Sequence, residues 1–381
     1  MALIDLRNEI DNIDDQLTEL LAKRMECSLK VAEIKRAEGL PVYHPQREQA
    51  IFEKIKNKSE KYGDYFVEIY RLLMECSRAL QYENLATEEN NELTKIIKTA
   101  PETLDIKGDV ACYGQLGAFT HIALNSINNS NATPVFCSDF EDVFKAVESN
   151  KTEFGFVPVE NSSAGSVDEV YDLILKYKLY IVGAVAMPIV HNLLGISGAT
   201  LSDIKTVYSH PQALMQCKQF LKQNNITPKE YQNTAAAAKL VSEMGDRSVG
   251  SIGSLACAAE NNLEVIKPSV QAFSNNQTRF IVISKHPVIP IDSNKISVVF
   301  TLSHTAGSLQ KILTRFSLHG LNLTKLESRP GKNGDFETQF YLDFLGNVVD
   351  GKTLSLLSAL FTELNEFFFL GNYKEISLNF N

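Results

Sequence analysis

Apolar positions recur at steps of three and four through residues 1–90, which is the spacing of helices with one apolar face. Pro41 and Pro45 bracket the single break in this pattern. The pattern predicts one long helix, followed by helices at 45–58 and 65–85. The stripe on the long helix comprises Ile10, Ile13, Leu17, Leu20, Leu21 and Val31. Three such helices bury little core alone, so we expect an all-helical domain that dimerises to cover its apolar face.

A polar stretch at 87–107 is expected to be the frayed end of a helix followed by a linker. From Val110 onward, short apolar runs alternate with amphipathic segments, which is typical of an α/β fold. The predicted strands are 110–113, 133–137, 154–159, 180–186, 205–208, 248–252 and 279–284. The predicted helices are 117–127, 139–149, 165–177, 211–223, 234–244 and 254–261.

After Pro287 and Pro290 the order of the elements changes. The pattern there predicts strands at 295–302, 321–329, 336–345 and 373–380, with helices at 306–319 and 351–370. This βαββαβ order is that of the ferredoxin-like fold. The chain is therefore expected to be multidomain, with an all-α domain at 1–90, an α/β domain at 109–286 and a ferredoxin-like domain at 295–381.

Composition narrows the classes of protein that these domains can form. The 381 residues include 44% apolar and 22% charged side chains, an ordinary globular balance. No apolar run approaches the roughly 18 residues of a membrane span. The charged start lacks the apolar core of a signal peptide, so we expect a cytoplasmic protein that does not bind membranes. The net charge of −9 argues against nucleic acid as a partner.

Neither a metal nor an organic cofactor is indicated. The six cysteines, at 27, 76, 112, 137, 217 and 257, form no CxxC pair, so we expect reduced thiols rather than a zinc site or disulfides. The stretch 113–120 places glycines between a strand and a helix, where a backbone can approach an anion. It lacks the third glycine and the later acid of a dinucleotide-binding fingerprint.

Charged residues of the helical part are spaced so that several can share one ligand. Arg24 and Lys35 are eleven residues apart, close to three turns, and therefore lie on one face of the long helix. Arg7 lies roughly 26 Å from Arg24 along the axis, and reaches the same ligand only from a partner helix packed antiparallel. Ser77 and Gln81 share a face of the third helix.

These positions resemble the all-helical chorismate mutase family over nearly the whole of residues 1–85. The matching stretches are Leu6-Arg7, Leu20–Arg24, Ile34-Lys35, Pro45–Glu48 and Glu75–Ser77, with Gln81 following. The resemblance implies a Claisen rearrangement of chorismate to prephenate. For that pericyclic reaction, the enzyme must hold the two carboxylates of the substrate and keep the substrate in a compact conformer. It also needs donors at the ether oxygen, which gains negative charge as it breaks.

The same resemblance implies a role for each residue. The carboxylates would be held by Arg7 (from the other subunit), Arg24 and Arg47. Lys35 and Gln81 would be the catalytic donors to the ether oxygen. Glu48 would lie near the substrate hydroxyl, and Ser77 would line the pocket. Before Pro45 this chain has His44, where some members of the family carry an acid that contacts the substrate.

Five turns in the central part carry clusters of hydrogen-bond donors. Each follows a predicted strand and opens a predicted helix: residues 113–120, 157–166, 209–214, 233–238 and 253–256. Ligands of open α/β sheets bind at such turns, beyond the carboxyl ends of the strands. The turns therefore predict a site of backbone N–H groups and hydroxyls for a carboxylate-rich ligand, although ordinary helix capping explains any one of them.

Together these segments resemble prephenate dehydratase across about residues 109–286. VPxENS from Val157, SHPQAL from Ser209 and TRF from Thr278 stand in the order of that family. The resemblance implies two α/β lobes, similar to those of periplasmic binding proteins, with the site in the cleft between them. It also implies the reaction, in which prephenate loses CO2 and its ring hydroxyl to give phenylpyruvate.

By this resemblance, Thr278 is the catalytic donor to the leaving hydroxyl, acting through a hydrogen bond rather than as a strong acid. Arg279 offers a planar fork that matches a carboxylate. For His210, ordering of the turn is an alternative to contact with the substrate. Gln277 stands where other members carry a second hydroxyl residue. The implied contacts to prephenate are Asn161, Ser162, Ser209, His210, Gln212 and Arg279.

The last part resembles the ACT regulatory domain over about residues 295–381, through Thr305–Leu309 and Glu327–Pro330. The resemblance implies an allosteric ligand, L-phenylalanine, bound between two such domains and causing feedback inhibition. A purely structural dimerisation module is the alternative. The implied contacts to phenylalanine are Gly307, Ser308, Leu309, Asn322, Glu327, Ser328 and Arg329.

The whole chain is therefore expected to be a bifunctional, cofactor-free enzyme of phenylalanine biosynthesis that forms a homodimer or a higher homo-oligomer. Its small-molecule partners would be chorismate, prephenate and phenylalanine. Two alternatives stay open. One is arogenate dehydratase activity, on a substrate with an amine in place of the keto group. The other is a catalytically silent sensor of aromatic metabolites.

Overall fold

The computed structural model describes residues 2–85, 91–127, 132–272, 275–331 and 337–378. Contacts divide the chain into two compact units, one of residues 1–99 with 295–369 and one of residues 100–294 with 370–381. Three predicted segments lie partly outside the described residues. They are the linker at residues 87–90, the strand 336–345 at residue 336, and the last strand at residues 379–380. In the described part of the chain, no helix is long and apolar enough to cross a membrane.

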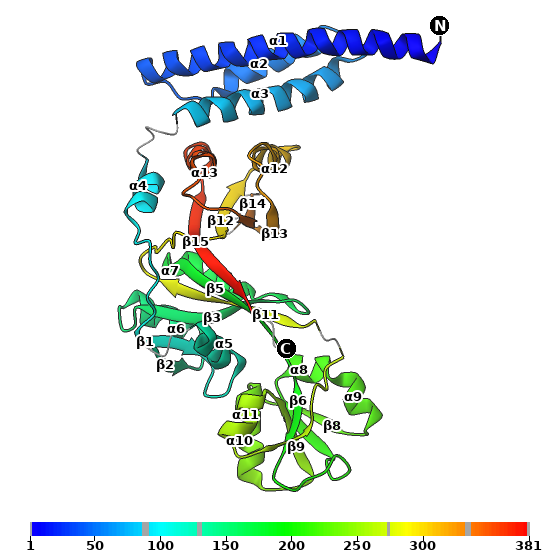
Figure 1. Cartoon of the computed structure of the whole chain (residues 1–381), viewed down its shortest axis with the longest axis vertical. Coiled ribbons are helices and arrows are strands. Elements are labelled where there is room, and N and C mark those ends of the chain that lie inside the picture. The colour runs from blue at the N-terminus through cyan, green and yellow to red at the C-terminus, as the bar shows by residue number, and fades with distance from the viewer. Residues whose placement is uncertain (1, 86–90, 128–131, 273–274, 332–336, 379–381) are drawn as a thin grey trace. The chain divides into compact units, whose positions relative to one another are not determined.

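The first unit begins with the three predicted helices, which lie side by side in Figure 1: α1 (Leu3–Glu38), α2 (Pro45–Lys56) and α3 (Gly63–Leu85). Helix α1 ends at Gly39, whose φ of 64° is left-handed and suits glycine. Helix α2 begins where His44 accepts a hydrogen bond from the backbone N–H of Arg47, with Pro45 in the first turn. The predicted all-helical fold of this part is confirmed.

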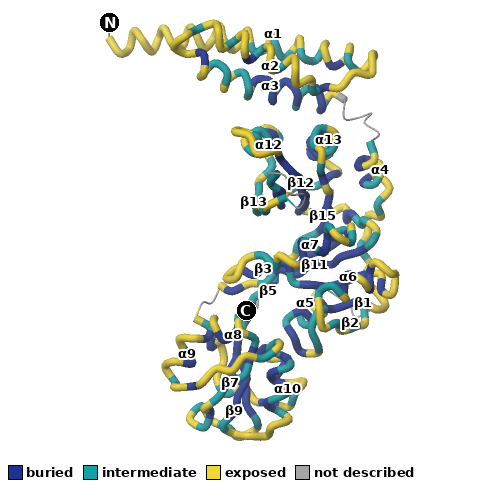
Figure 2. The backbone as a smooth tube through the Cα atoms, turned by 180° about the vertical axis from the view of Figure 1, so that it is seen from behind, coloured by how far each residue is buried: buried dark blue, intermediate teal, exposed yellow. Residues whose placement is uncertain are grey.

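The apolar stripe of α1 is largely exposed, as the colours of Figure 2 show. Its side chains are between 43% and 62% exposed at Ile10, Ile13, Leu17, Leu20 and Val31. Ala32 is the one buried residue that α1 contributes among the described residues. The helical part by itself therefore leaves this apolar face uncovered.

From Lys295 the chain has the predicted βαββαβ order: β12 (Lys295–Leu302), α12 (Ser308–Leu318), β13 (Leu323–Pro330), β14 (Thr338–Leu345), α13 (Gly351–Glu363) and β15 (Phe367–Ser377). Residues 370–377 of β15 belong to the second unit, and the other residues of these elements belong to the first. The strands lie in the order β13-β14-β12-β15. The prediction of a helix as far as 370 is wrong, because α13 ends at Glu363 and the strand β15 begins at Phe367. Phe367 and Phe369 are 9% and 8% exposed, whereas Phe368 is 37% exposed.

The expected linker contains a short helix, α4 (Glu92–Thr99), that the sequence pattern did not predict. The side chain of Asn91 caps it by accepting a hydrogen bond of 2.9 Å from the backbone N–H of Thr94. Leu93 and Ile97 are buried, and α4 contacts α13. Tertiary packing therefore stabilises a helix in a segment whose composition is mostly polar.

The second unit contains two α/β lobes, each with its own sheet (Figure 1). In the first lobe the strands lie in the order β5-β11-β3-β1-β2, and β4 pairs with β3. Their bounds are β1 (Gly108–Tyr113), β2 (Ala132–Cys137), β3 (Phe154–Asn161), β4 (Gly165–Ser166), β5 (Tyr180–Pro188) and β11 (Gln277–Ser284). The helices of this lobe are α5 (Phe119–Ile127), α6 (Phe140–Glu148) and α7 (Asp168–Tyr177).

The end of β15 joins this first lobe, which the sequence pattern did not predict. Residues 374–377 pair in parallel with residues 183–186 of β5. The approach requires glycine at position 371, because a Cβ there would lie 2.0 Å from the carbonyl oxygen of Ile181. One strand therefore begins in the βαββαβ part and ends in the α/β part.

The sheet of the second lobe has the order β10-β6-β9-β7-β8. Its strands are β6 (Asn192–Gly195), β7 (Thr206–Ser209), β8 (Thr227–Glu230), β9 (Val249–Gly253) and β10 (Glu264–Lys267). Its helices are α8 (Pro211–Gln216), α9 (Lys218–Gln223), α10 (Thr234–Met244) and α11 (Leu255–Glu260). The predicted strands and helices of the central part are confirmed, except that 211–223 is two helices divided at Cys217 and that β4, β6, β8 and β10 were missed.

Candidate active sites

A cavity of about 280 Å³ lies among the three N-terminal helices and the turn before α2. It brings together six predicted residues that are spread over 58 positions of sequence: Arg24, Lys35, Arg47, Glu48, Ser77 and Gln81. His44 also lines it. Arg7 is exposed on α1 and is not among the lining residues. The spacing argument for Arg24 and Lys35 is therefore confirmed.

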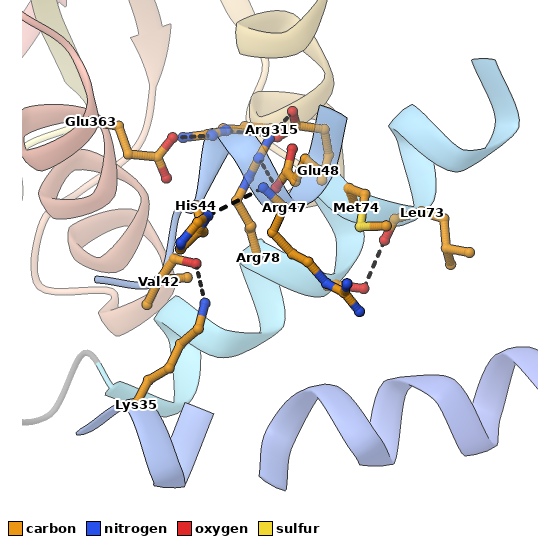
Figure 3. Close-up of polar contacts among 12 residues, drawn as sticks. Lys35, Val42, His44, Arg47, Glu48, Leu73, Met74, Arg78, Arg315 and Glu363 are labelled. Carbon is orange, nitrogen blue, oxygen red and sulfur yellow. Dashed lines mark hydrogen bonds and ion pairs between the residues drawn. The ribbon is translucent and has the colours of Figure 1, made fainter. Parts of the chain in front are cut away.

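Hydrogen bonds fix several of these side chains. Arg24 donates to the Ser77 hydroxyl at 2.6 Å, and that hydroxyl donates to the carbonyl oxygen of Leu73 at 2.8 Å. The Lys35 ammonium donates to the carbonyl oxygen of Val42 at 2.5 Å (Figure 3). Gln81 is buried, and its side-chain oxygen has no hydrogen-bond partner among the described residues. The cavity is thus lined by oriented donors.

The charge of this cavity is mainly positive. Its lining contains four basic side chains, at positions 24, 35, 47 and 78, and one carboxylate, that of Glu48. Burial, helped by the nearby Arg78, lowers the pKa of Lys35, and Glu48 opposes that shift. A small dianion with two carboxylates matches this balance of charge.

Arg78 is a lining residue that the sequence analysis missed. Its guanidinium forms ion pairs with Glu48 and Glu75 and lies over the ring of Tyr43, 4.7 Å from the ring centroid. It stands next to Ser77, but nothing in the apolar spacing distinguishes a buried arginine from one on a solvated helix face. The packing of the three helices determines the position of Arg78.

A second cavity, of about 370 Å³, lies between the two lobes of the second unit. Four of the five predicted turns contribute to its lining, through residues such as Gly114, Asn161, His210 and Asn233. The fifth turn packs behind the first, where Ser254 donates to the carbonyl oxygen of Gly117 at 2.9 Å. Neither lysine nor arginine is among the described residues that line this cavity. Amides, hydroxyls and backbone N–H groups are therefore its donors.

Thr278, on β11, lines this cavity beside Asn161 of β3. The side-chain N–H of Asn161 donates to the Thr278 hydroxyl at 2.8 Å. The side-chain oxygen of Asn161 accepts hydrogen bonds from Ser163, Ala164 and Gln212, which fixes the orientation of the amide. Because the Thr278 oxygen accepts from Asn161, its own O–H remains to donate to a ligand.

Of the other predicted contacts, two line the cavity and three, Ser162, Ser209 and Arg279, do not. Gln212 and His210 both line it, and His210 also accepts a hydrogen bond from the backbone N–H of Gln212, so it orders the turn as well. Ser209 is fully buried and donates to the carbonyl oxygen of Ile252 at 2.7 Å. Ser162 accepts from the backbone N–H of Gln277 at 2.9 Å. These two serines therefore form hydrogen bonds to the backbone of neighbouring strands and are not part of the cavity surface.

Arg279 is also outside the cavity lining, and its contact with a substrate carboxylate stays a prediction. Side chains of a strand alternate between its two faces, so Thr278 and Phe280 face the cavity and Arg279 faces away. Its guanidinium pairs with Glu375 at 2.9 Å and Glu160 at 3.4 Å, and donates to the Tyr373 hydroxyl at 2.8 Å.

His191 and Gln216 are lining residues that the sequence analysis missed, and Asn276 lies directly behind them. His191 shares a hydrogen bond of 2.8 Å with Gln216, and burial lowers its pKa to about 4, so its ring is neutral near pH 7. Asn276 donates to Gln216 and accepts from Asn161. Asn276 and Gln277 form a polar pair directly before Thr278, and this pair is the feature of the sequence that could have identified Asn276 as a residue near the site.

The residues predicted to bind phenylalanine lie at two places in the βαββαβ part. Gly307 precedes α12 with a φ of 82°, a left-handed conformation that suits glycine. Asn322, just before β13, and Ser328, on β13, are exposed. Glu327 forms ion pairs with Lys325 at 3.2 Å and Arg329 at 2.8 Å. The described residues therefore present these groups at a surface.

Comparison with protein families gives two matches. The model of prephenate dehydratase matches residues 110–288, and that of chorismate mutase type II matches residues 6–82. A bifunctional chorismate mutase/prephenate dehydratase from Aquifex aeolicus is 33% identical over 384 aligned residues, covering 99% of each chain. An arogenate dehydratase/prephenate dehydratase from Arabidopsis thaliana is 37% identical, covering 67% of this chain and 69% of that one.

A solved structure supports the fold of the region after the helical part. The prephenate dehydratase from Arthrobacter aurescens, in complex with L-Phe, has a TM-score of 0.65 and 28% identity. The similarity covers 70% of this chain and 90% of that one.

Proposed function

Because the chain belongs to the family of bifunctional chorismate mutase/prephenate dehydratases, we propose that its two cavities divide the two reactions. The helical cavity rearranges chorismate to prephenate. The cavity between the two lobes converts prephenate to phenylpyruvate. The alternative of a catalytically silent sensor is set aside, since both parts of the chain match enzyme families.

In the mutase cavity, Arg24 and Arg47 hold the carboxylates of chorismate, with Arg7 supplied by a second chain. The mainly positive lining supports this assignment. Lys35 and Gln81 donate to the ether oxygen, where negative charge grows as the C–O bond breaks. Glu48 accepts from the substrate hydroxyl. No group is transferred to the protein, so catalysis consists of holding a compact conformer and stabilising that charge.

In the dehydratase cavity, Thr278 donates to the ring hydroxyl of prephenate. Loss of the ring carboxylate as CO2 supplies the electron pair that forms the new ring double bond as the C–O bond breaks. The hydrogen bond from Thr278 stabilises the departing hydroxide, which takes one proton from solvent and leaves as water. The observation that carries this proposal is the hydrogen bond from Asn161 to Thr278, which directs the O–H of Thr278 away from Asn161. Backbone N–H groups at the start of α10 and the side-chain amide of Gln212 hold the side-chain carboxylate.

The test is chorismate turnover followed by ultraviolet absorbance, with phenylpyruvate quantified at the end. Wild type is expected to consume chorismate and to form phenylpyruvate. Thr278→Ala is expected to abolish phenylpyruvate formation while chorismate consumption continues. If both activities fell together in a folded Thr278→Ala protein, the assignment of separate cavities would be wrong.

Arogenate is the substrate alternative, since it differs from prephenate by an amine in place of a keto group. Glu160 is the one carboxylate among the described lining residues of the dehydratase cavity. A comparison of kcat/KM for prephenate and arogenate decides between the two, and we expect prephenate to be preferred because the chain carries its own mutase.

Regulation and assembly complete the proposal. The βαββαβ part is an ACT domain that binds L-phenylalanine between two copies, with Gly307 and the exposed face of β13 in contact with the ligand. The exposed stripe of α1 supports a homodimer that covers it. Phenylalanine is expected to lower the dehydratase rate, and an unchanged rate at millimolar concentration would contradict the ACT assignment.

A further inference from the structure

A chain of ion pairs within the first unit links α13 to the mutase cavity. Arg315 of α12 pairs with Glu363 of α13 at 2.5 Å and with Glu75 of α3 at 2.9 Å. Glu75 also pairs with Arg78, which in turn pairs with Glu48 in the cavity. Carboxylates and guanidinium groups therefore alternate along the whole path.

The path is buried through most of its length. The side chains of Glu363, Arg315, Glu75 and Arg78 are between 5% and 8% exposed, and that of Glu48 is 17% exposed. Burial by itself raises the pKa of Glu75, but Arg315 and Arg78 together bring it below its ordinary value. Glu75 is thus a carboxylate that depends on two cations for its charge.

Arg78 is shared between two carboxylates, and this sharing determines where it lies. Arg315 neutralises part of the charge on Glu75 and so weakens the pull of Glu75 on Arg78. Glu75 pairs with two cations of this path, Arg315 and Arg78. If Arg315 were absent, Arg78 would be the one cation of the path still paired with Glu75. It would then move toward Glu75 and release Glu48.

We propose that Arg315, in the C-terminal part of the chain, is a positioning residue for the mutase reaction. It acts through Glu75 and Arg78 to hold the carboxylate of Glu48 at the cavity. The inference rests on the proposed contact between Glu48 and the substrate hydroxyl. That contact exists in both the bound substrate and the transition state, so its loss raises KM more than it lowers kcat.

The test uses the full chain carrying Arg315→Met. The KM for chorismate is expected to rise roughly tenfold, which is within the usual range of coupling between linked sites, with a smaller change in kcat. The dehydratase rate on added prephenate serves as an internal measure of folding and is expected to remain at the wild-type value. Lys311→Met removes a cation from the same helix, one turn earlier, and is expected to leave both activities unchanged.

The double variant Glu75→Gln/Arg315→Met separates positioning from simple loss of structure. Without the charge of Glu75, Arg78 keeps Glu48 as its one carboxylate partner on this path, so KM is expected to return toward the wild-type value. An additive structural effect predicts instead that the double variant is no better than Arg315→Met. Three results would each overturn the proposal. They are a double variant no better than Arg315→Met, an unchanged KM in Arg315→Met, and a joint loss of both activities.

Glu48→Gln, measured alongside, distinguishes failure of this inference from failure of the proposed site. An unchanged KM in Glu48→Gln would refute the assignment of Glu48 to the substrate hydroxyl. A raised KM in Glu48→Gln together with an unchanged KM in Arg315→Met would refute the positioning role of Arg315 alone.

Discussion

At the scale of single residues, the dehydratase cavity depends on the orientation of one amide. Four hydrogen bonds, from Ser163, Ala164 and Gln212, fix the side-chain oxygen of Asn161, which turns its N–H toward Thr278. A threonine hydroxyl has one proton and can accept as well as donate. Because it accepts from Asn161, its proton is available to the substrate. The motif in the sequence identified both residues, but not the direction of this hydrogen bond.

Asn161→Asp tests this direction with almost no change in shape. A carboxylate cannot donate, so the O–H of Thr278 would turn to donate to the introduced carboxylate and would no longer reach the leaving group. We expect kcat on prephenate to fall on the order of 10²-fold. Chorismate turnover by the same protein is the control, and an unchanged dehydratase kcat would contradict the proposed role of Asn161.

The pKa of Lys35 gives a prediction of pH dependence for the mutase. Lys35 donates only when protonated, and burial lowers its pKa below the ordinary value. Activity is therefore expected to be full at pH values below this lowered pKa and to fall as pH rises through it, earlier than the ~10.4 of a free lysine. Lys35→Arg, which stays charged, should remove this alkaline limb from the pH profile of kcat. A limb that persists in Lys35→Arg would belong to another group.

At the scale of elements, β15 is the segment where sequence and structure differ most. The run of three phenylalanines fits the apolar face of a helix as well as a buried strand, and the pattern alone placed it in a helix. In the structure Phe367 begins a strand that continues into the α/β sheet, with a close contact at Gly371. Glu375 on its far end then pairs with Arg279, next to Thr278.

Gly371→Ala tests the passage of β15 along β5. The added Cβ would lie 2.0 Å from the carbonyl oxygen of Ile181, so the strands must separate. We expect a loss of about 1–3 kcal/mol in the free energy of unfolding, measured with denaturant. Gly351→Ala is the matched control, because a Cβ there meets nothing within 4 Å. Equal effects of the two substitutions would show that the close approach costs nothing.

At the scale of the whole molecule, Arg7 is not among the described residues that line the mutase cavity, and the apolar face of α1 is exposed. One antiparallel copy of the same helix would supply both. Arg7 is too far along the helix axis to reach the cavity of its own chain, so the geometry of the long helix itself favours a site shared between two chains.

Mixing two inactive variants tests the shared site. Arg7→Ala and Arg24→Ala are each expected to lack mutase activity. After the two are unfolded and refolded together in equal amounts, half of the dimers contain both chains, and each of these has one intact site. About a quarter of the wild-type mutase activity is therefore expected to return, as symmetry of a two-chain assembly requires. Absence of any recovery would mean that Arg7 acts within its own chain or not at all.

The sequence by itself determined most of the order of the elements and the motifs that mark both sites, whereas contacts between distant segments divide the chain into two units. Periodicity and turn chemistry are local, so they can be predicted without knowing which segments meet. The tertiary structure decided what depends on distant partners. It excluded Arg279, Ser162 and Ser209 from the cavity lining, turned residues 367–370 from helix to strand, and joined Arg315 to Glu48 through Glu75 and Arg78. Buried charges and strand faces are set by packing between segments far apart in the chain, and no spacing along one segment records them.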